Sequence, residues 1–331
     1  MTLHLAFISS AFVMTVGDRR LSIGPAGRKT EWDPYANKTI VIEAINGRVA
    51  VSYAGLAYIK SVATDLWLLT AITGEALEPP GGTPHGGPGV RISGPLNLTV
   101  GRIRAAITSA IERDFVREAA ADRAQSIEVL IVGWTWTRAA TTGRGRPTTF
   151  AEFITHKGEP GTSCSVSTVR RCWWQDPAPS TLPWSQLSIG SALLNDQRFE
   201  RLKTRMTEPG SVMTPGEVEC WMADEIRLVA DDPRCTTVGT ELMSVLIVPN
   251  KPPVIRFLRD LTLSRPNIAF SPSYVSTAGM ILPPQQMTGR LPSLVTGSEE
   301  SPRVVQLECV PPLEPTGSTS SMGGQVRRRW P

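Results

Sequence analysis

The stretch TLHLAFISSAFVMTVGDRR, Thr2–Arg20, decides how this chain is interpreted. Two apolar runs, 3–8 and 12–16, flank a small polar turn, so they predict two short paired strands. Because Met1 precedes a small residue, we expect methionyl aminopeptidase to remove it and Thr2 to become the first residue of the mature chain. A threonine in that position carries a nucleophilic hydroxyl and, in its own α-amino group, a base that can activate the hydroxyl.

The composition excludes several classes of function. With 331 residues, 41% of them hydrophobic, the chain can form one large domain or two small ones. Its net charge of +4 is too small to indicate a nucleic-acid partner. The five cysteines form no CxxC pair and the three histidines have no neighbour at ligand spacing. We therefore expect no disulfide framework, no metal and no other cofactor.

The apolar run Leu3–Val16 is not expected to be a signal peptide. No basic region precedes it, serines interrupt it, and no small-residue cleavage site follows it. No other run approaches the length of a membrane-spanning helix. These features predict a soluble, cytoplasmic protein without a membrane partner.

The order of the remaining elements predicts the fold class. Asn46-Gly47 is a strong turn signal between two predicted strands, 39–44 and 48–53. Runs of strands then alternate with pairs of helices, which favours two stacked, mainly antiparallel sheets with helices on both outer faces. We expect an α+β protein with a four-layer αββα sandwich. The further predicted elements are helices 57–72, 100–123, 195–206 and 215–229, and strands 126–136, 149–155, 165–173, 241–248 and 254–258.

Composition also divides the chain. Residues 2–250 carry the regular patterns and form the predicted core domain. The Pro- and Gly-rich segment 78–94 predicts a surface insertion that spans about 76–97. Residues 251–331 form a predicted C-terminal extension, which we expect to be extended or partly disordered after 290 because Pro, Ser and Gly are frequent there.

Five residues stand in a fixed order relative to these elements. Thr2 opens the first strand, Asp18 closes the second, and Lys38 precedes the second hairpin. Gly55 precedes the first helix, and Ser191 follows the turn Ser188-Ile189-Gly190. In this series the chain resembles the proteasome β-type subunits of the N-terminal nucleophile hydrolases, over roughly Thr2–Val248. The segment between Asp18 and Lys38 is several residues longer than is typical of those subunits.

The resemblance implies a role for each of the five residues. Thr2 would be the nucleophile, and Lys38 would stabilise its deprotonated hydroxyl by positive charge. Asp18 would keep the Lys38 ammonium charged and oriented. The Gly55 N–H would donate to the oxyanion, and Ser191 would complete the hydrogen bonds around the α-amino group.

Three further residues are implied as supports of the site. Arg20 would brace the site structurally. Asp231 or Asp232 would supply the late aspartate of the family, although Pro233 and Arg234 blur that alignment.

The function implied is threonine-type hydrolysis of amide bonds, most simply of peptides, through an acyl-enzyme on Thr2. Subunits of this kind assemble as rings, so a homo-oligomer is expected. Two alternatives remain open: a catalytically inactive scaffold or ring subunit with the same fold, and a small-molecule amidase of the same superfamily.

Overall fold

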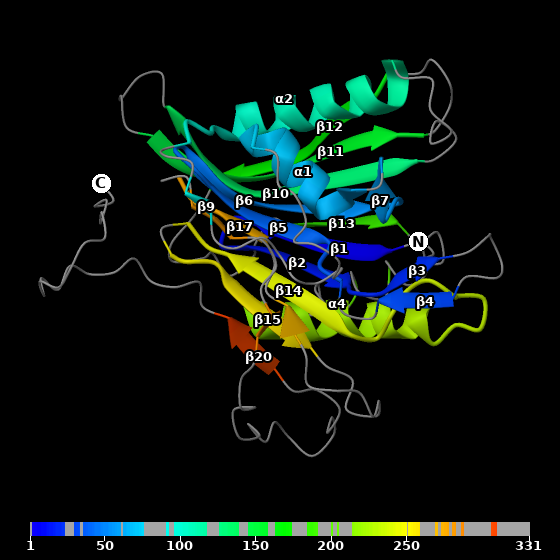
Figure 1. Cartoon of the computed structure of the whole chain (residues 1–331). Coiled ribbons are helices and arrows are strands. Elements are labelled where there is room, and N and C mark those ends of the chain that lie inside the picture. Colours follow the sequence, from blue (N-terminus) through cyan, green and yellow to red (C-terminus); the bar gives the residue numbers. More distant parts are fainter. Residues whose placement is uncertain are drawn as a thin grey trace, which may run out of the picture.

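The computed structural model describes most of the predicted core. The described residues are 2–23, 30–33, 36–60, 62–75, 91–92, 96–117, 126–138, 145–157, 163–173, 184–190, 200, 204, 214–249, 251–258, 269–270, 273–277, 280–282, 286–287 and 306–309. They form a mixed α+β fold in which strands predominate and helices are few (Figure 1).

A six-stranded antiparallel sheet holds the N-terminal strands, in the order β13-β1-β2-β14-β15-β20. The predicted first hairpin is confirmed, because His4 pairs with Gly17 and Ile8 pairs with Val13. β1 is an inner strand with β13 on its other side, so both of its edges are hydrogen-bonded. The strands are β1 (Leu3–Ser9), β2 (Val13–Asp18), β13 (Trp184–Gly190), β14 (Leu242–Ile247), β15 (Val254–Leu258) and β20 (Gln306–Cys309).

An eight-stranded sheet has the order β12-β11-β10-β6-β5-β17-β18-β9. Its pairs are antiparallel, apart from β17, which lies parallel to β5. The strands are β5 (Thr39–Ala44), β6 (Gly47–Ala54), β9 (Arg91–Ile92), β10 (Ile127–Arg138), β11 (Gly145–His156), β12 (Ser165–Trp173), β17 (Ser273–Val275) and β18 (Met280–Leu282). Three short hairpins complete the strands: β3 (Leu21–Ile23) with β4 (Thr30–Asp33), β7 (Tyr58–Ile59) with β8 (Val62–Ala63), and β16 (Ala269–Phe270) with β19 (Gln286–Met287).

The second hairpin is confirmed, with its turn one residue earlier than predicted. Ala44 pairs with Gly47, so the two turn residues are Ile45 and Asn46. Gly47 is already part of β6, where a Cβ atom would lie 2.1 Å from the carbonyl oxygen of Trp134 on β10. The glycine is therefore required by the close approach of β10 rather than by the turn.

The helices are α1 (Thr64–Thr73), α2 (Val100–Ile111) and α4 (Pro215–Ala230). α4 confirms the prediction for 215–229, since Thr214 and Glu217 form a capping box and Pro215 occupies the first turn. α2 continues as a π-helical segment over Glu112–Arg117.

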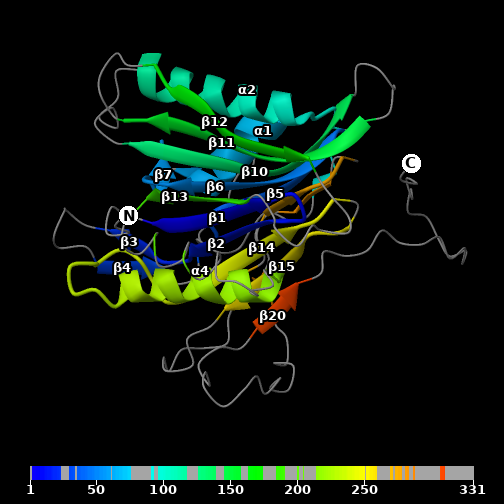
Figure 2. The ribbon, with the colours of Figure 1, turned by 180° about the vertical axis from the view of Figure 1, so that it is seen from behind.

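Three apolar clusters show how these elements stack. One joins α1 and α2 to the larger sheet, a second lies between the sheets, and a third joins α4 to the smaller sheet. Figures 1 and 2 show the same arrangement, with α1 and α2 on one side of the strands and α4 on the other. Because side chains alternate along a strand, β1 contributes to two of these clusters. Ala6 and Ile8 face the other sheet, whereas Leu3, Leu5 and Phe7 face α4.

Two helix predictions need correction. The predicted helix 57–72 begins only at Thr64, because Tyr58–Ile59 and Val62–Ala63 pair as β7 and β8, with Lys60 at a φ of 51°. Thr64 closes this turn, donating from its hydroxyl to Leu56 O (2.8 Å) and from its amide to Ala57 O (3.0 Å). The helix predicted at 100–123 leaves α-helical geometry after Ile111, and residues 118–123 lie outside the described residues. The helix predicted at 195–206 also lies outside them, apart from the helical Glu200 and Thr204.

Segments beyond the predicted core domain contribute to both sheets. After residue 250, β15 pairs with β14, and β17 pairs with β5. Within the predicted insertion 76–97, Arg91–Ile92 pairs with β18, whereas 76–90 lies outside the described residues.

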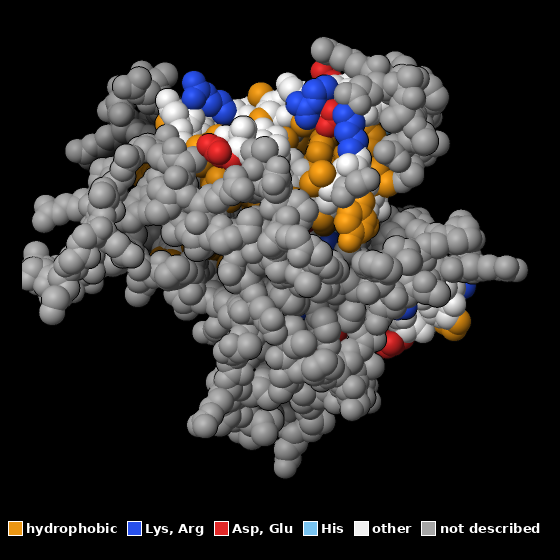
Figure 3. All heavy atoms as spheres, viewed as in Figure 1, with side chains coloured by type: hydrophobic (Ala, Val, Ile, Leu, Met, Phe, Trp, Pro, Cys, Tyr) orange, Lys and Arg blue, Asp and Glu red, His pale blue; other side chains and the backbone are white. Residues whose placement is uncertain are grey.

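The described surface is mixed in character. Figure 3 shows Lys and Arg side chains next to hydrophobic ones over α1 and α2. None of the helices in the described part of the chain is both long and apolar enough to cross a membrane.

Candidate active site around Thr2

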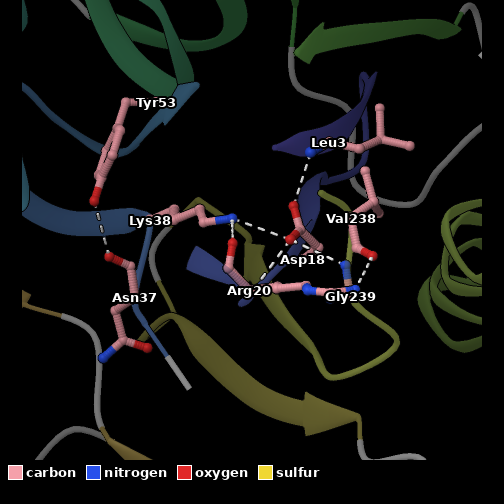
Figure 4. Close-up of polar contacts among 8 residues, drawn as sticks. All are labelled: Leu3, Asp18, Arg20, Asn37, Lys38, Tyr53, Val238 and Gly239. Carbon is pink, nitrogen blue, oxygen red and sulfur yellow. Dashed lines mark hydrogen bonds and ion pairs between the residues drawn. The ribbon is translucent and has the colours of Figure 1, made fainter. Parts of the chain in front are cut away.

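A buried carboxylate connects the first strand to the predicted lysine. Asp18 Oδ1 accepts a hydrogen bond from the backbone N–H of Leu3 (2.7 Å), and Oδ2 accepts one from Lys38 Nζ (3.0 Å) (Figure 4). Oδ2 also accepts from the backbone N–H of Arg20 (3.1 Å) and of Gly239 (3.3 Å). The Asp18 carboxylate therefore bridges the Lys38 ammonium and the backbone amide of Leu3, the residue after Thr2.

The backbone fixes this carboxylate at the end of its strand. Asp18 is the last residue of β2 and pairs with Leu242 on β14. The next amide, that of Arg19, donates to Glu241 O (3.0 Å). The end of β2 is thus held from the side opposite to β1.

Lys38 reaches Asp18 from the other sheet. It precedes β5, and its carbonyl oxygen accepts from the amide of Tyr53 (3.1 Å) on β6. Its side chain is 1% exposed and that of Asp18 is 0% exposed, so the pair is removed from water. Lys38 Nζ also donates to the carbonyl oxygen of Arg20. An isolated buried ammonium would tend to lose its proton, and these two acceptors compensate for its desolvation.

Thr2 is buried where β1 begins, against a glycine that it requires. It is 6% exposed, and Gly190 on β13 pairs with the next residue, Leu3. Gly190 has a φ of 102°, and a Cβ atom there would lie 1.6 Å from the carbonyl oxygen of Thr2. Only glycine permits this approach. Ser191, the predicted partner of the α-amino group, lies outside the described residues.

Gly55 lies at the same end of the two sheets. It has a φ of 110°, and a Cβ atom there would lie 2.2 Å from the carbonyl oxygen of Ser126. The Cβ atom of the preceding Ala54 would be 3.4 Å from a Cβ atom at Gly190. The segment that carries Gly55 therefore approaches the strand that contacts Thr2, although among the described residues no hydrogen bond joins Gly55 to Thr2.

Arg20 contacts the loop after α4. The Arg20 guanidinium donates to Val238 O at 3.5 Å. This loop reaches the site through Val238 and through the amide of Gly239, which binds Asp18. Of the two predicted aspartates in the loop, Asp231 caps α4 and Asp232 binds the Arg234 guanidinium at 2.7 and 3.0 Å.

Two polar side chains near Thr2 are absent from the predicted set. Glu128, at the start of β10, accepts a hydrogen bond from the amide of Gly190 (2.8 Å) and so ties the larger sheet to the strand beside Thr2. His4 is 1% exposed, and a Cβ atom at Gly17 would lie 1.9 Å from its Nδ1 atom, so the ring lies directly over Gly17. Burial, and to a smaller extent the charge of Lys38, lowers the pKa of His4 to about 3. The sequence offered one signal for His4, a polar residue inside an apolar strand.

The arrangement supplies a buried cation, held by an anion, next to a strand that starts with a hydroxyl residue. Such a cation stabilises a developing negative charge in a site that excludes water. Among the described residues, no group of three or more His, Cys, Asp and Glu side chains is arranged to hold a metal ion.

Comparisons with known proteins give structural similarities only. No protein-family model matches the chain, and no curated protein matches it. Among solved structures, it is similar to Anbu (ancestral beta-subunit) from Yersinia bercovieri, with 13% identity, a TM-score of 0.40, and coverage of 74% of this chain and 82% of that one. It is also similar to an Anbu (Gly-1) mutant from Hyphomicrobium sp. strain MC1, with 12% identity, a TM-score of 0.42, and coverage of 86% and 88%. A third is the helical assembly of the Anbu complex from Pseudomonas aeruginosa, with 13% identity, a TM-score of 0.39, and coverage of 74% and 80%. At these identities and TM-scores the similarities say nothing of this chain's activity.

Proposed function

We propose that the chain is an amide hydrolase of the N-terminal nucleophile type, with an αββα sandwich fold and Thr2 as nucleophile once Met1 is removed. One observation carries the proposal. The Asp18 carboxylate binds both the Leu3 amide and the Lys38 ammonium, and all three lie in the buried region where β1 begins.

The proposed reaction uses Thr2 twice. The free α-amino group, whose ordinary pKa is about 7.7–8.0, takes the proton from the Thr2 hydroxyl as Oγ attacks the carbonyl carbon of the substrate. The same group then passes this proton to the leaving amine, so that the C–N bond breaks and an ester on Thr2 remains. Water hydrolyses the ester, which releases the acid and restores the hydroxyl.

The neighbouring residues stabilise charge along this path. The Lys38 ammonium favours the deprotonated hydroxyl, and Asp18 keeps the ammonium in position. The Gly55 N–H donates to the oxyanion, a contribution of about 2.7–4 kcal/mol for one such donor. Ser191 hydrogen-bonds the α-amino group, while Arg20, with Asp231 or Asp232, supports the site.

The remaining parts of the proposal concern the whole protein. We propose a peptide or similar amide as substrate, a homo-oligomer such as a ring, and a cytoplasmic location. The division into a core region 2–250, an insertion 76–97 and an extension from 251 also stays a proposal, as a division of the sequence and not as parts that fold independently.

The decisive experiment is reaction with a peptide epoxyketone, followed by mass mapping. This reagent forms bonds to both the hydroxyl and the free amine of an N-terminal threonine, so one cyclic adduct joined to Thr2 through both atoms supports the nucleophile and the removal of Met1 together. Thr2→Ala should abolish the adduct, and Thr155→Ala in the larger sheet should not affect it. The intact mass of the purified protein distinguishes the enzyme from the inactive alternative. A chain that retains Met1 has no free Thr2 amine, which is the result expected of an inactive scaffold. A panel of peptides and simple acyl amides separates a peptidase from a small-molecule amidase.

A further inference from the structure

Towards Thr2, polar side chains enter the apolar layer between the two sheets, next to apolar residues such as Ile189 and Met243. Away from the site this layer is filled by side chains such as Ala6, Val13 and Val41. Strand alternation places four polar side chains on the same faces nearer to Thr2, each two residues from an apolar one. They are His4, Thr15, Thr39 and Ser52, and all are at most 2% exposed.

Two of these four side chains satisfy each other. Thr39 and Ser52 form a hydroxyl–hydroxyl hydrogen bond of 2.9 Å across β5 and β6. In contrast, both ring nitrogens of His4 and the hydroxyl of Thr15 are buried without a hydrogen-bond partner among the described residues.

The unsatisfied groups are neighbours on the smaller sheet. His4 pairs with Gly17, and Ala6 pairs with Thr15, so His4 and Thr15 are diagonal neighbours across β1 and β2. The His4 ring leans over Gly17, which brings it onto the strand that carries Thr15. A buried polar group without a partner costs about 1–3 kcal/mol, so three of them together require a common explanation. A buried water typically makes about three hydrogen bonds in such a place.

The same groups adjoin the proposed catalytic network. His4 follows Leu3, whose amide binds Asp18, and it pairs with Gly17, the residue before Asp18. Thr2 lies two residues before His4, directly before the first residue of β1. The effect of the Lys38 charge on the imidazole agrees with this proximity.

We propose that His4 and Thr15 hold an ordered water between the sheets, and that His4, through this water, positions Lys38 and Thr2 for catalysis. The catalytic part of this inference rests on the proposed function. A neutral imidazole suits the task, because one nitrogen donates to the water or a neighbour while the other accepts. The water adds a polar contact on the inter-sheet side of the site, opposite to the contacts that the loop after α4 provides. His4 is thus a positioning residue and takes no proton from the substrate.

The first test requires no activity. In the full chain labelled with ¹⁵N-histidine, His4 should show a neutral imidazole from pH 5 to 8 and a nuclear Overhauser contact to a long-lived water. A high-resolution crystal structure should place that water within hydrogen-bonding distance of His4 and of Thr15 Oγ1. A dry inter-sheet layer, or protein atoms bonded to both ring nitrogens, would overturn the proposal.

The second test measures positioning by the rate of Thr2 modification. His4→Phe keeps a flat ring over Gly17 without hydrogen-bonding groups, and Thr15→Val removes only the hydroxyl. Both should lower the rate at saturating epoxyketone by about fivefold, the factor for one neutral hydrogen bond, with an unchanged half-saturation concentration. His4→Gln should recover part of the rate.

His156 provides a matched control for His4, because it is also a buried histidine. His156 is 2% exposed, with its ring 5.6 Å from that of Phe115 below the helices, and His156→Phe should react like the unmodified sequence. Unchanged rates in both His4→Phe and Thr15→Val would exclude the positioning role. If His4→Phe does not fold, Thr15→Val decides alone. If the unmodified sequence forms no Thr2 adduct, the proposed function fails, whereas the spectroscopic test still decides whether the water is present.

Discussion

Asp18 and Lys38 depend on each other because each is a buried charge. Removing one partner of such a pair costs about 3–5 kcal/mol, since the other charge remains desolvated. We therefore expect Lys38→Met to lower the free energy of unfolding by that amount in urea denaturation and to abolish Thr2 modification. The double variant Asp18→Asn/Lys38→Met should recover much of the stability but none of the reactivity.

The ion pair of Arg234 and Asp232 is the comparison, because one partner is exposed. The Arg234 side chain is 74% exposed and that of Asp232 is 10% exposed, so Arg234→Met should cost less than Lys38→Met, about 1 kcal/mol. If Lys38→Met lowered the stability no more than Arg234→Met and still allowed Thr2 modification, the buried pair would not be needed for the site.

Gly190 provides a test that involves no charge. Gly190→Ala places a methyl group against the carbonyl oxygen of Thr2, and it must shift the start of β1. We expect Thr2 modification to fall by at least about 100-fold, because small displacements of reacting groups are costly. Gly216→Ala is the control, since nothing lies within 4 Å of its added methyl group and alanine favours a helix by about 1 kcal/mol. Equal rates in the two variants would contradict the close contact at Thr2.

His4 predicts a direction for the pH dependence of stability. Its pKa is about 6.5 in an unfolded chain and about 3 in the fold, so the unfolded chain binds the extra proton between these values. The stability associated with His4 is complete above pH 6.5 and is lost as the pH falls towards 3. The limiting slope is about 1.4 kcal/mol per pH unit.

The charge of Lys38 also acts on the His4 imidazole, and other groups of the chain change their charge over the same range of pH. The contribution of His4 is therefore the difference between the unmodified sequence and His4→Phe, measured by urea denaturation at pH 7, 6, 5 and 4.5. Parallel stability curves for the two chains would show that His4 is not a buried neutral imidazole.

Some contacts between individual residues could be predicted from the order of motifs in the sequence. The contact between Asp18 and Lys38 could be anticipated because each residue stands at the end of a strand whose pairing is predictable from local patterns, whereas their catalytic roles stay a prediction. Gly190, Glu128 and His4 were missed as contributors because their positions depend on cross-strand register and on contacts between the sheets. Nothing in the local sequence states which carbonyl oxygen a glycine will face.

Helix α4 allows the stability of the fold to be changed separately from the reactivity of Thr2. Thr214→Ala removes half of the capping box and should cost about 0.5–2 kcal/mol. Because α4 packs on the face of the smaller sheet away from the inter-sheet layer, Thr2 modification should keep its rate. Thermal unfolding and epoxyketone kinetics on one preparation measure both effects. If Thr214→Ala lowered the rate of Thr2 modification without lowering the stability, α4 would act on the site directly.

The sequence predicted α4 and the first two hairpins well, and the region before α1 poorly. α4 has a strong cap, and the hairpins have alternating strands around short turns. Before α1, apolar spacing resembled a helix, but Lys60 adopts a left-handed conformation and Thr64 binds back to Leu56 and Ala57. A positive φ at a lysine is determined by tertiary contacts, so propensity could not reveal it.

For the whole molecule, the boundary at residue 250 can be tested by truncation. A chain that ends at 250 lacks β15 and β17, and it leaves apolar edges on β14 and β5. We expect it to aggregate or to unfold without a cooperative transition. A chain that ends at 290 keeps both strands and should unfold cooperatively in circular dichroism. A soluble, cooperatively folded 2–250 fragment would instead establish an independent core domain.

The pairing of distant strands was the least predictable aspect of the fold. The sequence indicated α+β structure and antiparallel hairpins, but the parallel contact of β17 with β5 joins residues more than 200 positions apart. Local patterns carry no record of such a partner, because its choice depends on the edges left open after the rest of the sheet has formed.

The contact between Gly239 and Asp18 has a consequence for biosynthesis. Thr2, the proposed nucleophile, is synthesised before the loop that completes the hydrogen bonds of Asp18, because this loop lies more than 200 residues further along the chain. β14, which holds the end of β2, emerges just after that loop. During synthesis the proposed nucleophile is therefore present before the hydrogen-bonding partners of Asp18 that belong to the proposed site.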